Sequence, residues 1–155
     1  MLFWLILILG LLLDQATKYL ASAKLVFGQP VELIPGIFQF NLVYNTGAAF
    51  SILKGHTFLF AIMAMVVLLI LIIIYYFTPK EQRLWRIALS LTAAGILGNM
   101  VDRLRLGYVV DFFDCIIWPI FNVADTLLVV GAALLIIVSF RQWHKETKAA
   151  KIQGK

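Results

Sequence analysis

Two aspartates, Asp111 and Asp125, stand in a stretch of the sequence that is otherwise almost entirely apolar. A charged side chain costs about 2.5–3.5 kcal/mol at the centre of a membrane helix on insertion scales, so acids in such surroundings call for an explanation. Two carboxyl groups that are brought close together cannot both ionise cheaply, and they therefore share a proton. One of them can then activate water as a base while the other protonates a carbonyl oxygen. The pair therefore predicts hydrolysis of peptide bonds without a metal ion or a cofactor.

Each acid also has a simpler interpretation. Asn122-x-x-Asp125 follows Pro119 and is close to a capping box, in which both side chains only satisfy free amides at the start of a helix. Asp111 is open to interpretation as an exposed loop acid, and Asp114 is expected to be one. A carboxylate site for Mg²⁺ or Ca²⁺ is a further alternative, but no intramembrane histidine and no repeated Asp-x-x-x-Asp pattern supports it.

The composition is that of an integral membrane protein. Of the 155 residues, 63% are hydrophobic and 14% are charged, and the mean hydropathy is +0.96. Soluble domains are nearer half apolar and a quarter charged. The net charge of +5 is concentrated in the loop 78–86 and in the tail after Phe140. This is the positive-inside pattern of a membrane protein, and it argues against a nucleic-acid-binding surface.

Four apolar stretches predict transmembrane helices. The first begins at Met1 and extends to about Leu20, and it is retained because no cleavage site follows it. The other predicted helices are Phe58–Phe77, Ile87 to about Val101, and Phe121–Phe140. Between the first two, Lys24–Gly55 is rich in glycine and proline and contains an alternating apolar and polar run at Phe38–Leu42, which predicts a short sheet outside the hydrocarbon core. No repeat or linker divides the chain, so residues 1–155 are expected to form one domain. Cys115, the single cysteine, is expected to be a packing residue.

The predicted topology brings distant polar residues to one membrane level. Four helices place both termini on the same side, and the basic loop and tail make that side cytoplasmic. Asp14 and Lys18 are spaced to pair on one helix face, either as an interfacial ion pair or as a brace for an active site. The polar residues expected near the outer face are Asp14, Asn45, Asn99, Asp102, Arg103, Asp111, Asn122 and Asp125.

At these residues the sequence resembles the bacterial lipoprotein signal peptidases, or signal peptidase II. The matching segments, in the order of the family, are Asp14-Gln15-Ala16-Thr17-Lys18, Asn45-Thr46-Gly47-Ala48-Ala49-Phe50, Gly98-Asn99-Met100-Val101-Asp102-Arg103, Val109-Val110-Asp111-Phe112 and Phe121-Asn122-Val123-Ala124-Asp125. Each segment alone is weak, but five in order with a matching four-helix layout are highly specific.

The resemblance implies an all-α polytopic membrane protein with four transmembrane helices and a small extracytoplasmic β-cradle. The β-cradle and a short amphipathic helix would map to roughly Lys24–Gly55. The enzyme would be an intramembrane aspartic endopeptidase of the bacterial cytoplasmic membrane, with both termini in the cytoplasm. It would remove the signal peptide from diacylglyceryl-modified prolipoproteins, on the N-terminal side of the lipidated cysteine.

The resemblance also assigns residues and partners. The catalytic aspartates would be Asp111 and Asp125, with no metal and no cofactor. The supporting or substrate-lining residues would be Asp14, Lys18, Asn45, Gly47, Gly95, Asn99, Arg103 and Asn122. Expected partners are lipid-modified prolipoproteins, membrane lipids and globomycin-type cyclic peptide inhibitors, and the protein is expected to be a monomer that binds no nucleic acid. The rival functions are a small ion-coupled transporter, a membrane lipid phosphatase, and a non-enzymatic assembly factor that would tolerate Asn at both aspartates.

Overall fold

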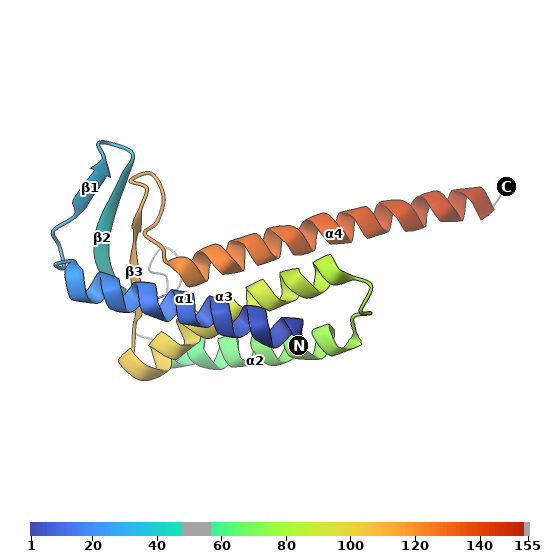
Figure 1. Ribbon diagram of the computed structural model, residues 1–155, viewed down its shortest axis with the longest axis horizontal. Coiled ribbons are helices and arrows are strands. Elements are labelled where there is room, and N and C mark those ends of the chain that lie inside the picture. Colours follow the sequence, from blue (N-terminus) through green and yellow to red (C-terminus); the bar gives the residue numbers. More distant parts are fainter. Residues whose placement is uncertain (48–56, 154–155) are drawn as a thin grey trace.

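The computed structural model describes residues 1–47 and 57–153. It contains four long helices and a three-stranded sheet at one end of the helical bundle (Figure 1). The elements are α1 (Leu2–Lys24), β1 (Val31–Ile34), β2 (Phe38–Asn45), α2 (Thr57–Phe77), α3 (Arg83–Leu106), β3 (Val109–Asp114) and α4 (Val123–Gln153). Both termini lie at the end of the bundle away from the sheet (Figure 1).

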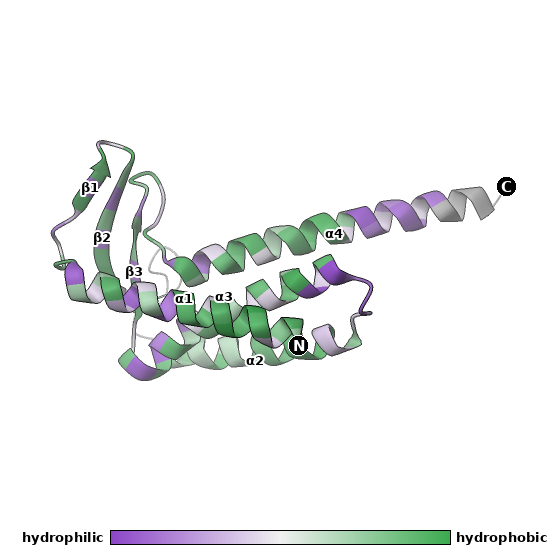
Figure 2. Ribbon diagram, in the orientation of Figure 1, coloured by the Kyte–Doolittle hydropathy of each residue, from purple (hydrophilic) through white to green (hydrophobic). Residues whose placement is uncertain are grey.

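All four helices are long and apolar enough to cross a membrane. They extend beyond the predicted bounds: α1 continues to Lys24, α3 runs from Arg83 to Leu106, and α4 continues to Gln153, although it begins two residues later than Phe121. The prediction followed the apolar runs, whereas the helices continue into polar turns outside the hydrocarbon core. Figure 2 shows this change of polarity along the C-terminal part of α4.

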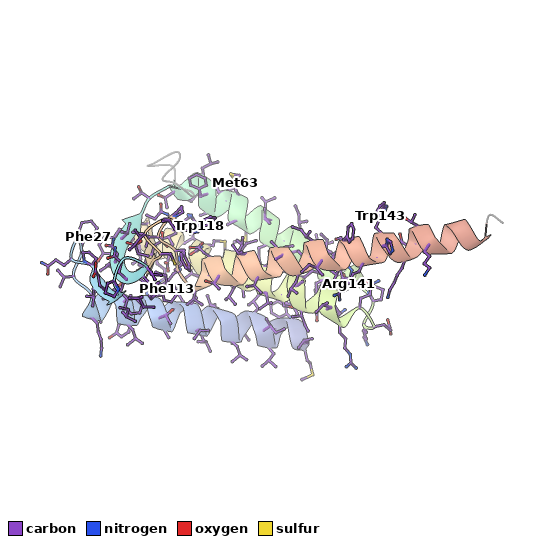
Figure 3. The ribbon with its side chains drawn as sticks, turned by 90° about the horizontal axis from the view of Figure 1, so that it is seen from above. Phe27, Met63, Phe113, Trp118, Arg141 and Trp143 are labelled. Carbon is purple, nitrogen blue, oxygen red and sulfur yellow. The ribbon has the colours of Figure 1, made fainter. Side chains whose placement is uncertain are left out.

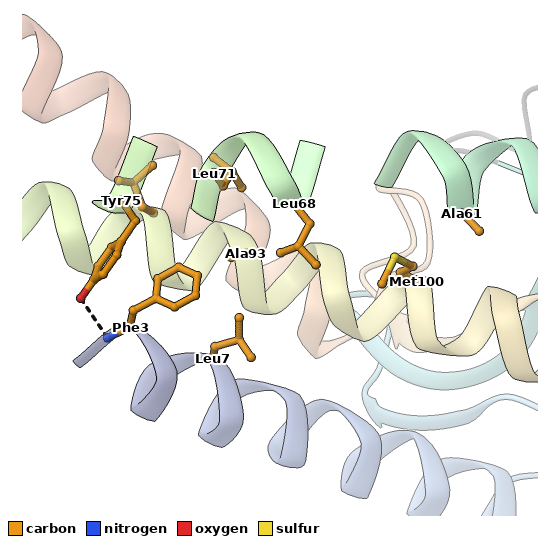
Figure 4. Packing of buried hydrophobic residues seen from close by; sticks show 9 residues of the cluster. Phe3, Leu7, Ala61, Leu68, Leu71, Tyr75, Ala93 and Met100 are labelled. Carbon is orange, nitrogen blue, oxygen red and sulfur yellow. Dashed lines mark hydrogen bonds between the residues drawn. The ribbon is translucent and has the colours of Figure 1, made fainter. Parts of the chain in front are cut away.

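Helix α3 is the centre of the bundle and packs against each of the other three helices. In the most apolar 18-residue stretch of α3, 56% of the residues are buried, against 17% in that of α2. Helix α2 therefore presents most of its surface to lipid. Phe3 and Leu7 of α1 pack with Leu68 and Tyr75 of α2 around the buried Leu89 of α3. The Tyr75 hydroxyl accepts a hydrogen bond of 3.2 Å from the backbone N–H of Phe3, which satisfies one free amide at the start of α1 (Figure 4).

Helices α3 and α4 approach to backbone contact because small residues line their interface. A Cβ atom on Gly95 would collide with the carbonyl oxygen of Ala124 and would lie 2.7 Å from the backbone nitrogen of Leu128. One turn beyond, a Cβ on Gly98 would lie 2.6 Å from Oδ2 of Asp14. Small residues permit this close packing between membrane helices, and it holds the polar end of α3 beside the first turn of α4.

The sheet is antiparallel, with strand order β1-β2-β3. In its register Val43 pairs with Asp111 and Gln39 pairs with Asp114. The alternation at Phe38–Leu42 correctly predicted a strand. The amphipathic helix expected within Lys24–Gly55 is not found in the described part of that segment, where residues 25–47 form strands and turns; residues 48–56, which include Ala48-Ala49-Phe50, lie outside the described residues.

Candidate active site

Asp111 is held on β3 by two amides from other elements. The residue is 3% exposed. Its Oδ2 accepts a hydrogen bond from Asn45 Nδ2 at 3.0 Å, and its Oδ1 accepts one from Asn122 Nδ2 at 2.7 Å. Because Asn45 ends β2 and Asn122 immediately precedes α4, three elements meet at this carboxyl group. Asp111 is therefore a buried site residue and not an exposed loop acid.

Asp125 lies in the first turn of α4 and takes part in the capping box that the sequence suggested. Its Oδ2 accepts a hydrogen bond from the backbone N–H of Asn122 at 3.1 Å, and its own N–H donates to Asn122 Oδ1 at 2.9 Å. Capping does not account for the whole residue, since Asp125 Oδ1 also accepts a bond of 2.7 Å from Asn99 Nδ2 of α3. Asp125 lines the same cavity as Asp111.

Asn122 links the two aspartates. It is fully buried. Its backbone N–H donates to Asp125 Oδ2, and its side-chain oxygen accepts from the N–H of Asp125. Its side-chain amide nitrogen donates to Asp111 Oδ1, to Asn99 Oδ1 at 3.0 Å and to the carbonyl oxygen of Val110 at 3.2 Å. One rotamer of one residue therefore sets the position of both carboxyl groups.

A buried charge cluster lies beneath this pair. Lys18 Nζ is 2.9 Å from Asp14 Oδ2, 2.9 Å from Asp102 Oδ2 and 2.9 Å from Asn99 Oδ1. Lys18 is 3% exposed and Asp14 is 0% exposed. Buried charges are costly unless they are paired and hydrogen-bonded, and these are. The Asp14–Lys18 pair is therefore buried inside the protein beneath the cavity, a placement that favours a brace behind the site over an interfacial ion pair.

The same cluster anchors the starts of two neighbouring elements. Asp14 Oδ1 accepts a hydrogen bond of 2.9 Å from the backbone N–H of Ala124, at the positive end of α4. Asp102 Oδ2 accepts one of 3.1 Å from the backbone N–H of Val110 on β3. Gln15, which the sequence reasoning missed as a site residue, donates to Asp14 and to Asp102. Its only signal was its place beside Asp14 in the first matching segment.

Of the remaining predicted site residues, Arg103 and Gly47 lie beside the cavity, whereas Gly95 lies between two helices. Arg103 Nη2 donates to the carbonyl oxygen of Gly47 at 3.3 Å, and the N–H of Gly47 donates to Asn45 Oδ1 at 3.0 Å. These contacts fix the end of β2 above the cavity. Gly95 lies at the contact of α3 with α4 and does not line the cavity.

A cavity of about 720 Å³ opens above the aspartates. At one end its walls are polar, formed by Asn45, Asn99, Arg103, Asp111 and Asp125. The remaining walls are apolar and come from Val43, Val109, the loop 116–121, Leu128 and Val129. In that loop Ile117 is 95% exposed and Trp118 is 64% exposed, and Trp118 lies at the sheet end of the molecule (Figure 3). The cavity therefore joins carboxyl groups to a surface suited to lipid.

Burial of the Asp111 carboxyl, together with the neighbouring charge of Asp125, raises the pKa of Asp111 to about 7. The amides of Asn45 and Asn122 and the charge of Lys18 act in the opposite direction but are outweighed. A carboxyl group with such a pKa holds its proton at neutral pH in a substantial fraction of molecules, which suits a general acid.

Asp114, expected as an exposed loop acid, is instead 6% exposed and ends β3. Burial favours its neutral form, but hydrogen bonds from Gln39 Nε2 at 2.6 Å, Asn41 Nδ2 at 3.0 Å and the N–H of Ile116 at 2.8 Å outweigh burial and lower the pKa of Asp114. The expectation was wrong because two of these partners, Gln39 and Asn41, lie on β2, far away in sequence. Asp114 joins the two strands and does not line the cavity.

Within the described residues, no three His, Cys, Asp or Glu side chains lie close enough together to hold a metal ion. In the same part of the chain, every buried side-chain nitrogen and oxygen has a hydrogen-bond partner.

The chain is similar to known proteins over most of its length. A family model described as signal peptidase (SPase) II matches residues 6–141. A lipoprotein signal peptidase of Halothermothrix orenii is 40% identical over 139 residues, which cover 90% of this chain and 95% of the relative. Another, from Desulfitobacterium hafniense, is 39% identical over 149 residues, covering 96% and 99%.

Solved structures agree with these relatives. A bacterial membrane enzyme determined by the in meso method at 2.3 Å resolution superposes with a TM-score of 0.81 at 36% identity, covering 90% of this chain and 87% of that one. A second, at 1.9 Å resolution, gives a TM-score of 0.76 at 37% identity, covering 88% and 90%. Sequence, fold and the paired carboxyl groups in a membrane helix bundle lead to one conclusion: the chain belongs to the signal peptidase II family of aspartic peptidases.

Proposed function

We propose that Asp111 and Asp125 are the catalytic pair with which this signal peptidase removes signal peptides from lipid-modified prolipoproteins, cutting on the N-terminal side of the lipidated cysteine. The observation that carries the assignment is that both carboxyl groups line one cavity while a single side chain, Asn122, holds them both. The named relatives are lipoprotein signal peptidases, which supports this substrate class.

The chemistry needs only the two carboxyl groups and water. The ionised member takes a proton from water, whose oxygen attacks the carbonyl carbon of the scissile peptide bond. The protonated member gives its proton to the carbonyl oxygen, which yields a neutral tetrahedral diol. Collapse of the diol then breaks the C–N bond: the first carboxyl group returns its proton to the leaving nitrogen, and the second recovers a proton from a diol hydroxyl.

The supporting residues have distinct tasks in this proposal. Asn45 and Asn122 fix Asp111, Asn99 fixes Asp125, and Arg103 holds Gly47 at the end of β2. Asp14, Lys18 and Gly95 act beneath the cavity, by charge pairing and by close helix packing. The apolar walls at loop 116–121, Leu128 and Val129 offer a path along which the diacylglyceryl chains remain in lipid while the peptide backbone reaches the acids.

The finer features belong to the same proposal. The chain is one structural unit and acts as a monomer. Both termini are in the cytoplasm, because the basic loop 78–86 and the basic C-terminal part of α4 lie at the end of the bundle opposite the sheet (Figure 1). Membrane lipids surround α2 and the outer faces of α1 and α4. A globomycin-type cyclic peptide would inhibit by occupying the cavity above the aspartates.

The decisive test is cleavage of a lipidated prolipoprotein by the purified protein in detergent, with EDTA throughout. Wild type should cut before the lipidated cysteine, and Asp111→Asn and Asp125→Asn should lose activity by at least about 10³-fold while remaining folded, since Asn keeps the size of Asp but cannot carry the proton. Asp114→Asn, the same change on β3 outside the cavity, is the matched control and should retain most activity. Full activity of either catalytic variant, or inert wild type, would overturn the assignment.

A further inference from the structure

The side-chain amide of Asn99 lies between an ammonium group and a carboxyl group. Lys18 Nζ is 2.9 Å from Asn99 Oδ1, and Asn99 Nδ2 is 2.7 Å from Asp125 Oδ1. An ammonium group can only donate hydrogen bonds, so the amide atom that faces it must be the oxygen. The amide nitrogen must therefore face Asp125, to which it can only donate. The orientation of this amide is set by Lys18.

Lys18 has no freedom to release Asn99. Its ammonium group has three N–H donors, and its three acceptors, Asp14 Oδ2, Asp102 Oδ2 and Asn99 Oδ1, all lie at 2.9 Å. The residue is almost completely buried. Turning the ammonium away would leave a buried, charged donor unpaired, which is strongly unfavourable.

The two aspartates are not equally supplied with donors. Asp125 receives the Asn99 amide and the backbone N–H of Asn122, and it sits at the positive end of α4. Asp111 receives the Asn45 amide, but its other donor, Asn122 Nδ2, is shared with two further acceptors. An amide nitrogen has two N–H groups for these three acceptors. Donors favour the ionised form of a carboxyl group, so negative charge is better supported on Asp125.

Among the described residues, the other charges that face the pair come from two elements, and the neighbouring β2 and α2 contain no charged residue. They are Asp14 and Lys18 on α1, and Asp102 and Arg103 on α3. The charge of Arg103 interacts with Asp125 more strongly than with Asp111, so it favours negative charge on Asp125 in the same direction as the hydrogen bond from Asn99.

We infer that Lys18, acting through the Asn99 amide, keeps the negative charge of the catalytic pair on Asp125 and the shared proton on Asp111. This inference rests on the proposed function and assigns the order of its steps. Asp125 takes the proton from water, and Asp111 gives its proton to the carbonyl oxygen. On collapse of the diol, Asp125 protonates the leaving nitrogen and Asp111 takes a proton back. Lys18 is a positioning residue, since it does not line the cavity and reaches Asp125 only through Asn99.

The contacts from Lys18 to Asn99 and from Asn99 to Asp125 are called the relay below. The test is the pH dependence of kcat/KM in two variants that break this relay at different points without changing the net charge. Asn99→Leu removes the amide and keeps Lys18. Lys18→Met combined with Asp102→Asn removes the ammonium and one of its carboxylates and keeps the amide. Both should move the acid limb of the profile upward by about one pH unit, so that kcat/KM falls about tenfold on that limb and less on the plateau.

Thr17→Val is the matched control, because Thr17 lies beside Lys18 on α1 but its hydroxyl donates only to the carbonyl oxygens of Leu13 and Asp14 in its own helix. Its profile should keep the wild-type acid limb. A variant that loses activity equally at every pH, or a control that shifts as much as the relay variants, would overturn the inference. Comparison with Asp111→Asn and Asp125→Asn separates the two levels: if both are inactive but the relay variants keep the wild-type limb, the catalytic pair stands and the relay is wrong.

Discussion

Asn122 combines two tasks that usually belong to different residues. It caps α4 through its carbonyl oxygen and contacts Asp111 through its amide nitrogen. The capping box at Asn122 and Asp125 is therefore part of the site, and the choice between a helix cap and a catalytic group does not arise. The cost of the arrangement falls on Asp111, whose carboxyl group is buried beside another acid.

That cost predicts a pH-dependent gain of stability in Asp111→Asn. Burial and Asp125 raise the pKa of Asp111 to about 7, so the folded protein binds this proton more tightly than the unfolded chain does. Stability from this group is full below about pH 4 and is lost as the pH rises through about 7. The variant should gain on wild type by a few kcal/mol, or several degrees in Tm, between these values. Thermal unfolding in detergent measures this difference.

Glu32→Gln, on the exposed strand β1, is the control and should follow wild type at each pH. A difference between Asp111→Asn and wild type that stays constant with pH would contradict the prediction.

At the scale of elements, the backbone contact between α3 and α4 sets the depth at which Asn99 meets Asp125. A larger residue at Gly95 could not be accommodated by a change of side-chain rotamer, because the nearest atoms opposite Gly95 belong to the backbone of α4. The sheet fixes the position of the other aspartate, since pairing of β2 with β3 places Asn45 beside Asp111.

Gly95→Ala should separate these helices. The added Cβ collides with the Ala124 carbonyl and approaches Leu128 N to 2.7 Å, so α4 must move. We expect a loss of about 1–3 kcal/mol in stability and a larger loss of kcat than of substrate binding. Gly10→Ala on α1 is the comparison, because its Cβ would lie 2.9 Å from Ala94 Cβ and 3.1 Å from Leu127 Cδ1 and would meet no backbone atom, so a smaller shift of the helices relieves the contact. Equal effects of the two changes would argue against a special contact at Gly95.

The elements also show what the sequence could predict. Hydropathy found all four helices, because a bilayer needs long apolar runs, but not their ends, which continue into polar turns. Alternation found β2, whereas its pairing with β3 joins segments far apart in sequence and was not predictable from either alone. Asp114 was misjudged for that reason. The roles of Gln15 and Asp102 beneath the site depend on the crossing of α1 with α3, which no local pattern encodes.

At the scale of the whole molecule, polarity is divided between two ends. The sheet and the cavity lie at one end, and the basic loop 78–86 and the polar part of α4 lie at the other (Figure 1, Figure 2). Arg86 secures the basic end by donating to the carbonyl oxygen of Thr78 at 2.7 Å and by lying 3.9 Å from the ring centre of Tyr75. The charge asymmetry predicts one orientation in the membrane.

Cysteine labelling tests that orientation. In a Cys115→Ser background, Glu32→Cys on β1 should react with a membrane-impermeant maleimide in right-side-out vesicles. Lys145→Cys on α4 should react only after detergent opens the membrane, since the proposed orientation places the basic end in the cytoplasm. Both positions are exposed in the folded chain, so burial does not bias the comparison. The reverse pattern would contradict the orientation.

The bond from Ala124 N to Asp14 joins residues separated by 110 positions, and its carboxyl acceptor sits under the whole site. During synthesis α1 enters the membrane first and α4 last. A nascent chain with three inserted helices therefore lacks both Asp125 and the Ala124 N–H that donates to Asp14. On the proposed assignment, peptidase activity therefore requires that α4 has been inserted and has packed against α1.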